Sequence, residues 1–118
     1  MHRQLMNLLL TGIGSLCLIG CAMKSNLELK SGEYYFEKGY YKRAMQELMP
    51  PANQGNPRAQ YAIGYMYYYG YGVTQNTDAG YFWIEKAARA EDPNAMEAVQ
   101  LIAAERTRPK RTYTRYLR

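Results

Sequence analysis

The sequence contains little of what catalysis, metal binding or disulfide bonding requires. Its 118 residues include one histidine, His2, and two cysteines, Cys17 and Cys21, all within the first 21 positions. The rest of the chain therefore has no imidazole or thiol for a metal site, a nucleophile or a disulfide. Its carboxylates are scattered over predicted helical and capping positions rather than paired as acid and base. We therefore expect no enzyme, no metal and no cofactor.

The N-terminus carries the most specific targeting signal. A basic start with His2 and Arg3 is followed by the apolar run LMNLLLTGIGSLCLI, and LIGC ends at Cys21. This order resembles the signal peptide and lipobox of a bacterial lipoprotein, and the resemblance implies cleavage after Gly20 and acylation of Cys21, with palmitate among the lipids. The alternative is a retained membrane-spanning helix, but a run of about 15 residues is shorter than the roughly 20 that a span needs.

The resemblance also implies a location and a division of the chain. Ala22 rather than aspartate follows the lipidated cysteine, which favours the outer membrane, with the protein facing the periplasm. We expect a signal peptide at 1–20, a lipidated N-terminus and linker at 21–26, a repeat domain at 27–105 and a basic disordered tail at 106–118. Six linker residues span at most about 20 Å, so the repeat domain should lie close to its membrane.

Charge differs sharply between the repeat domain and the tail. Residues 21–105 contain 8 Lys or Arg and 10 Asp or Glu, whereas residues 106–118 contain 6 basic residues and no acidic one. The tail is either an adhesive for an anionic surface or partner, or a solvated end that only aids solubility. Nucleic acid is not an expected partner outside the cytoplasm.

The middle of the chain repeats at a spacing of 36 residues. Asn56-Pro57 corresponds to Asp92-Pro93, and alanines follow both pairs at the same offset. Each pair predicts a helix start, because Asn or Asp caps a helix and proline suits its first position. One apolar helical face is formed by Gly80, Trp83, Ile84 and Ala87. A period of this length predicts stacked helical units, with five helices and no strand over about residues 27–105.

The segment AQYAIGYMYYYGYGV followed by DAGYFWIEKAA resembles a Sel1-like repeat. The resemblance is carried by Ile63-Gly64, Tyr67, the Gly70-x-Gly72-Val73 loop, Trp83 and Ala87-Ala88. Gly80 replaces the family's usual alanine, which we expect to weaken its helix by about 0.5–1 kcal/mol. The preceding unit fits tetratricopeptide (TPR) spacing through Gly32, Tyr35, Ala44 and Leu48. The implied fold is all-α, a short α-solenoid of two antiparallel helix hairpins plus a capping helix at about 93–105.

The tyrosines of GYMYYYGYGV are candidates for partner binding. On a helix, Tyr61, Tyr65 and Tyr68 form a stripe separate from the apolar stripe of Ile63 and Met66. In repeats of this class the first helix of each pair lines the concave face. The candidate partner-binding residues are therefore Tyr61, Tyr65 and Tyr68, with Tyr34 and Tyr35 on the first hairpin. The alternative is that these tyrosines only pack against neighbouring helices.

These features predict a lipid-anchored adaptor that binds a protein or peptide through the concave face of its repeats, within an assembly of the cell envelope. One alternative is a structural or biogenesis lipoprotein of a secretion system or pilus, in which the lipid and the tail matter more than the concave face. Another is a cell-wall ligand binder or an envelope enzyme. No metal or nucleic acid enters any of these hypotheses.

Overall fold

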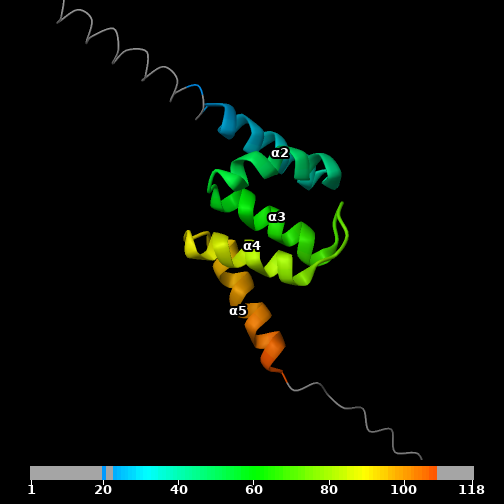
Figure 1. Ribbon diagram of the computed structural model, residues 1–118, viewed down its shortest axis with the longest axis vertical. Coiled ribbons are helices and arrows are strands. Elements are labelled where there is room, and N and C mark those ends of the chain that lie inside the picture. The colour runs from blue at the N-terminus through cyan, green and yellow to red at the C-terminus, as the bar shows by residue number, and fades with distance from the viewer. Residues whose placement is uncertain (1–19, 21–22, 109–118) are drawn as a thin grey trace, which may run out of the picture.

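The computed structural model describes residue 20 and residues 23–108, which form five helices and no strand (Figure 1). The N-terminal helix covers residues 23–37. It is followed by α2 (Tyr41–Asn53), α3 (Pro57–Tyr69), α4 (Thr77–Arg89) and α5 (Pro93–Thr107). Helix α3 packs against α2 and α4, and α5 packs against α4. The predicted all-α solenoid is confirmed.

The first and last helices are longer than the sequence indicated. Residues 23–26, assigned to a linker, are already helical, and an ion pair of 3.8 Å between Lys24 and Glu28 links successive turns there. The last helix continues to Thr107, whose hydroxyl donates to the Ala103 carbonyl at 3.1 Å. The predictions for the signal peptide, for Cys21 and for most of the tail lie outside the described residues.

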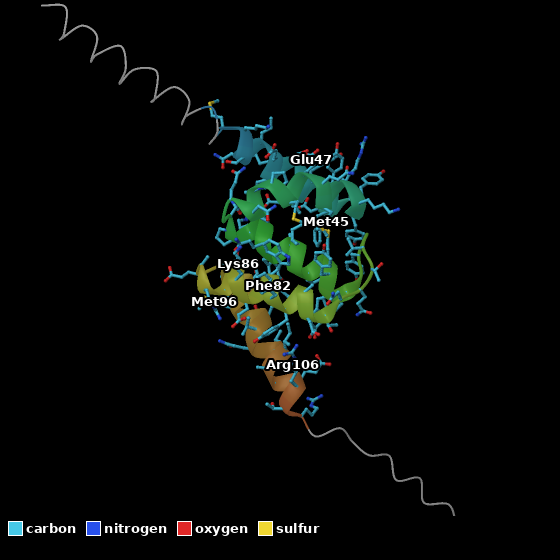
Figure 2. The ribbon with its side chains drawn as sticks, viewed as in Figure 1. Met45, Glu47, Phe82, Lys86, Met96 and Arg106 are labelled. Atoms are coloured by element: carbon cyan, nitrogen blue, oxygen red, sulfur yellow. The ribbon has the colours of Figure 1, made fainter. Side chains whose placement is uncertain are left out.

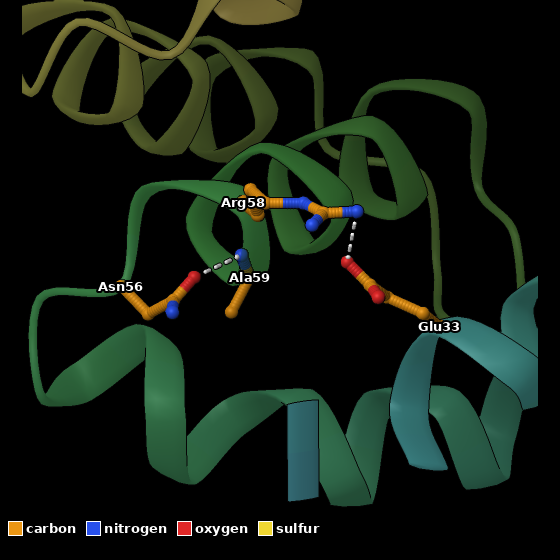
Figure 3. Close-up of polar contacts among 4 residues, drawn as sticks. All are labelled: Glu33, Asn56, Arg58 and Ala59. Carbon is orange, nitrogen blue, oxygen red and sulfur yellow. Dashed lines mark hydrogen bonds and ion pairs between the residues drawn. The ribbon is translucent and has the colours of Figure 1, made fainter. Parts of the chain in front are cut away.

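Three of the helices begin with a side-chain cap. An Asn or Asp oxygen accepts a hydrogen bond from the backbone N–H three residues later, which satisfies one of the donors that a helix start leaves open. These bonds join Asn56 to Ala59 at 3.1 Å, Asn76 to Ala79 at 2.9 Å, and Asp92 to Ala95 at 2.9 Å (Figure 3 for Asn56). The helix starts that the sequence predicted at 57 and 93 are confirmed.

The core consists of two clusters of buried side chains. The first lies between the N-terminal helix, α2 and α3, and comprises Leu29, Ala44, Leu48, Ala52, Ala59, Ile63 and Met66. The second lies between α4 and α5, and comprises Ile84, Ala87, Ala95 and Ile102. Tyr67 packs against the first cluster. Helix α3 thus separates a buried apolar side from a side that carries its other tyrosines.

Two glycines bring α3 and α4 into backbone contact. A Cβ placed on Gly64 would lie 2.8 Å from the Gly80 carbonyl oxygen, and one on Gly80 would lie 2.6 Å from the Tyr68 nitrogen. Neither position has room for a side chain. Gly80 lowers helix propensity, as expected from the sequence, but it also permits this close crossing of the two helices.

The loop between α3 and α4 folds back onto the start of α2. Gly70 ends α3 in the left-handed conformation (φ 74°), and Gly72 also has a positive φ of 69°. A Cβ on Gly72 would meet the Tyr41 Cβ at 2.7 Å, so the loop backbone lies directly against α2. This close contact brings Tyr71 beside the N-terminal hairpin.

Candidate protein-binding groove

A groove of about 510 Å³ runs along the first helices of the successive units. Its walls come from the N-terminal helix, the start of α2, α3, the α3–α4 loop and the start of α5. The lining residues are Glu33, Phe36, Glu37, Tyr41, Arg58, Tyr61, Ala62, Tyr65, Tyr71, Asp92 and Asn94. The first helix of each unit therefore faces this groove, as the repeat architecture implied.

One wall of the groove is a continuous array of five aromatic rings. Tyr65 is at its centre, with ring centroids 5.8 Å from Phe36, 6.3 Å from Tyr61 and 5.8 Å from Tyr71. Tyr71 in turn stacks on Tyr41, with centroids 4.8 Å apart and planes at 17°. Such ring pairs stabilise one another by about 0.5–1.5 kcal/mol beyond area burial. The wall is therefore held in a fixed arrangement by its own members.

The groove carries an excess of negative charge. Three carboxylates, Glu33, Glu37 and Asp92, and one guanidinium, Arg58, are among its lining residues, which gives a formal net charge of −2. Arg58 Nη2 lies 2.8 Å from Glu33 Oε1, an ion pair that joins α3 to the N-terminal helix (Figure 3). Because the arginine side chain is 68% exposed, this pair contributes little stability, at most about 1 kcal/mol. Its main effect is to neutralise Arg58 locally.

Two of the groove hydroxyls titrate above their usual range. Burial is the largest cause that raises the pKa of Tyr61, followed by the neighbouring Tyr65 and Asp92. Burial also raises the pKa of Tyr65, with Tyr71 as the next contributor. Both phenols therefore stay protonated at physiological pH, where each hydroxyl can donate and accept hydrogen bonds.

The five candidate tyrosines have different surroundings in the structure. Tyr61 and Tyr65 line the groove together, and Tyr61 also packs against the second core cluster. Tyr68 packs against that cluster and is absent from the groove lining. Tyr35 packs against the first cluster, and Tyr34 is 56% exposed and does not line the groove. The partner-binding role of these residues stays a prediction. Because only Tyr61 and Tyr65 of the five line the groove, these two are the strongest candidates.

Other groove residues were not candidates from the sequence. Tyr71 and Tyr41 are in contact only because the glycine loop folds back onto α2. The path of a loop leaves no periodic pattern in the sequence, so this contact could not be predicted. Glu33 and Glu37 are four residues apart on one helix, so their shared face could have been recognised. Asp92 was predicted only as a helix cap, and it holds that role while it also lines the groove.

Neither metal coordination nor a membrane span is seen in the described part of the chain. Within residues 20 and 23–108, no group of three or more His, Cys, Asp or Glu side chains is arranged to hold a metal ion. Over the same residues, no helix combines the length and the apolar character that crossing a bilayer requires.

Comparison with known proteins identifies the repeat. The Sel1 repeat family model matches residues 57–92, which comprise α3, the glycine loop, α4 and the turn up to α5. The chain is 38% identical over 72 residues to the chitin synthase regulator SKT5 of Saccharomyces cerevisiae, an alignment that covers 61% of this chain and 10% of that protein. The chain thus spans about a tenth of that relative's length. No solved structure matches the chain significantly. Residues 57–92 of this chain thus match a Sel1 repeat, and Sel1 repeats indicate a protein-interaction adaptor.

Proposed function

We propose that this protein is a lipid-anchored adaptor that holds an extended segment of a partner protein in the groove. The observation that carries the proposal is the five-ring aromatic wall, which lines the groove along the first helices of the units. Tyrosine rings offer a large contact area at low entropic cost and end in a polar hydroxyl, a combination enriched in protein interfaces. The matched relative is by its name a regulator, which agrees with an adaptor role.

The polar groups of the groove favour a peptide over a sugar. A carbohydrate site would pair aromatic faces with Asp, Asn or Arg groups that are available for sugar hydroxyls. Here Arg58 is engaged by Glu33, and Asp92 accepts from the Ala95 N–H at the start of α5. The Tyr61 and Tyr65 hydroxyls, together with Glu37 and Asn94, also line the groove and can bond to the backbone of a peptide segment.

The anchor in this proposal rests on the N-terminal sequence. The basic start, the apolar run and LIGC support processing to a lipidated Cys21, and Ala22 supports an outer-membrane location that faces the periplasm. Helical structure is present from residue 23, two residues beyond that cysteine. An anchored repeat domain would thus be held close to the membrane surface. Its partner would then belong to the same envelope assembly.

The anchor can be tested by metabolic labelling. Cells that express the full chain are grown with radiolabelled palmitate, and the Cys21→Ser variant is the control. We expect label on the wild-type protein, none on the variant, and loss of the variant from the membrane fraction. Equal labelling of the two proteins, or a membrane-bound variant without label, would contradict lipidation at Cys21.

The groove can be tested by crosslinking and co-purification from native membranes. The groove variant is Tyr65→Ala combined with Tyr71→Ala, because neither side chain belongs to a core cluster. The matched control is Phe82→Ala, since Phe82 is 59% exposed on α4 and does not line the groove. We expect a partner captured by the wild type and the control to be lost from the groove variant. Equal capture by all three proteins would show that the partner binds elsewhere.

A further inference from the structure

We propose that the basic C-terminal segment of this chain, residues 109–118, docks in the groove of the same molecule and competes there with the partner. This inference rests on the proposed function, because it concerns the regulation of the same groove. Three observations support it: the charge of the groove, the location of its uncovered rings and the place where the tail begins.

The groove and the tail have opposite charge. The lining of the groove has a formal net charge of −2, and its Glu37 has no ion-pair partner among the described residues. Residues 109–118 contain four basic side chains, Lys110, Arg111, Arg115 and Arg118, and no acidic one. They also contain Tyr113 and Tyr116, whose rings suit an aromatic wall. Charge of opposite sign favours the encounter and fixes its orientation.

The groove rings are available to cations. In the described part of the chain, four cation–π contacts occur, and all four cover rings outside the groove, namely Tyr34, Tyr35, Trp83 and Tyr81. The five rings of the groove wall have no such contact with any described residue. A Lys or Arg side chain that enters the groove would therefore find both an aromatic face and the Glu37 carboxylate.

The tail begins close enough to reach the aromatic end of the groove. Arg106, labelled on α5 in Figure 2, lies 4.0 Å from Asp78 at the start of α4, and its guanidinium is 4.5 Å from the Tyr81 ring centroid. Tyr71 precedes Asp78 by seven residues, so the two are at most about 25 Å apart. The eight residues that follow Thr107, up to Arg115, can span at most about 28 Å. Arg106 thus holds the end of α5 against the start of α4, and residue 109 follows three positions later.

The local concentration of a tethered segment strengthens this docking. A short flexible tether holds its end at an effective concentration of about a millimolar, so a weak contact is populated within one molecule. A partner segment must displace the tail, and a partner with higher affinity for the groove would release it. The tail then becomes free for an anionic surface or partner.

The experiment places a photocrosslinker in the tail of the full chain. Tyr113 is replaced by p-benzoylphenylalanine, the protein is irradiated in a neutral detergent, and the crosslinked peptides of the monomer are identified by mass spectrometry. We expect crosslinks to the groove segments 33–41 and 58–71. Glu37→Lys should reduce their yield about five-fold, because it replaces attraction with repulsion in the lining of the groove.

The matched control is Glu47→Lys, which changes the net charge equally on α2 (Figure 2) at a residue that does not line the groove. It should leave the yield unchanged. Crosslinks spread over the whole surface, crosslinks found only between two molecules, or equal loss in both variants would overturn docking within one chain.

A second measurement separates this inference from the proposed function. A chain that ends at Arg108 should capture more of the partner than the full chain, because its groove has no competitor. If truncation changes nothing while the Tyr65→Ala and Tyr71→Ala variant still loses the partner, the adaptor function stands and the tail proposal fails. If the tail crosslinks to the groove but the variant keeps its partner, the proposed function fails and only the self-docking of the tail stands.

Discussion

The two hairpins share one design but differ in how tightly their helices meet. In each, a glycine of the first helix faces a large buried aliphatic residue of the second, Gly32 against Leu48 and Gly64 against Ile84. A Cβ on Gly32 would meet only side chains, the nearest being Leu48 Cγ at 2.5 Å. A Cβ on Gly64 would also meet the backbone of Gly80. At these glycines, the helices of the first hairpin meet through side chains, whereas the helices of the second hairpin meet backbone against backbone.

The second helices of the two hairpins differ in their local signals. Helix α2 has Tyr40 as its N-cap residue, which makes no side-chain cap, and it contains Pro50 and Pro51, each of which removes a backbone donor. Helix α4 begins at the Asn76 cap and has Asp78 in its first turn, where a negative charge favours the helix dipole. Helix α2 therefore depends on packing, whereas α4 is also supported by its own sequence. The family model matches the second hairpin and not the first.

The largest expected difference between the hairpins is in the stability lost when a helical glycine is replaced by alanine. Gly80→Ala should lower the free energy of unfolding by about 2 kcal/mol, because the new methyl overlaps the Tyr68 backbone and forces α3 and α4 apart. Gly32→Ala should cost less, about 1 kcal/mol, because its methyl displaces the buried Leu48 side chain but meets no backbone. Thermal unfolding followed by circular dichroism measures both. Equal losses, or a gain for Gly80→Ala from better helix propensity, would remove the distinction.

The caps should show a smaller difference. Asn76→Ala removes the oxygen that accepts from the Ala79 N–H and should cost about 1 kcal/mol. Tyr40→Ala at the equivalent place on α2 removes no cap and should change stability by less than about 0.5 kcal/mol. Urea unfolding of the two variants compares them directly. A Tyr40→Ala loss as large as that of Asn76→Ala would mean that Tyr40 supports α2 through its ring contact with Tyr35.

The smallest effect is a loss of stability in alkaline solution that originates in the groove. Folding raises the pKa of Tyr61 and Tyr65 above 10.0, so the native state holds their protons more tightly than the unfolded chain does. The stability that the native state gains from this tighter proton binding is fully present below pH 10 and is lost as the pH rises through the native pKa values. Melting curves from pH 9 to 11 should show a shallower decline for Tyr61→Phe than for the wild type. The exposed Tyr34→Phe is the control, and an identical slope for both variants would contradict the assignment.

What the sequence could predict depends on how local each feature is. The helix starts at Pro57 and Pro93 and the buried places of Ile63 and Met66 follow from caps and helical periodicity, which involve only a few neighbouring residues. The walls of the groove depend on distant pairs. The Arg58 side chain reaches Glu33 from another helix. No local pattern encodes such a contact.

The tyrosine stripe shows the same limit. Helical spacing placed Tyr61, Tyr65 and Tyr68 together, but their surroundings differ along the helix. Tyr65 contacts Phe36 and the loop, while Tyr68 packs against the second core cluster. Which members of a stripe remain open is decided by the crossing of neighbouring helices. That crossing is in turn set by the contact between Gly64 and Gly80.

The most direct test of the account is hydrogen exchange on the complex with the captured partner. The account predicts that partner binding slows exchange in the groove segments of the N-terminal helix and α3, around residues 33–37 and 58–65, and leaves the exposed side of α4 around Phe82 unchanged. Protection that is confined to α4 and α5, with no change in the groove segments, would show that the partner binds another face and would contradict the account.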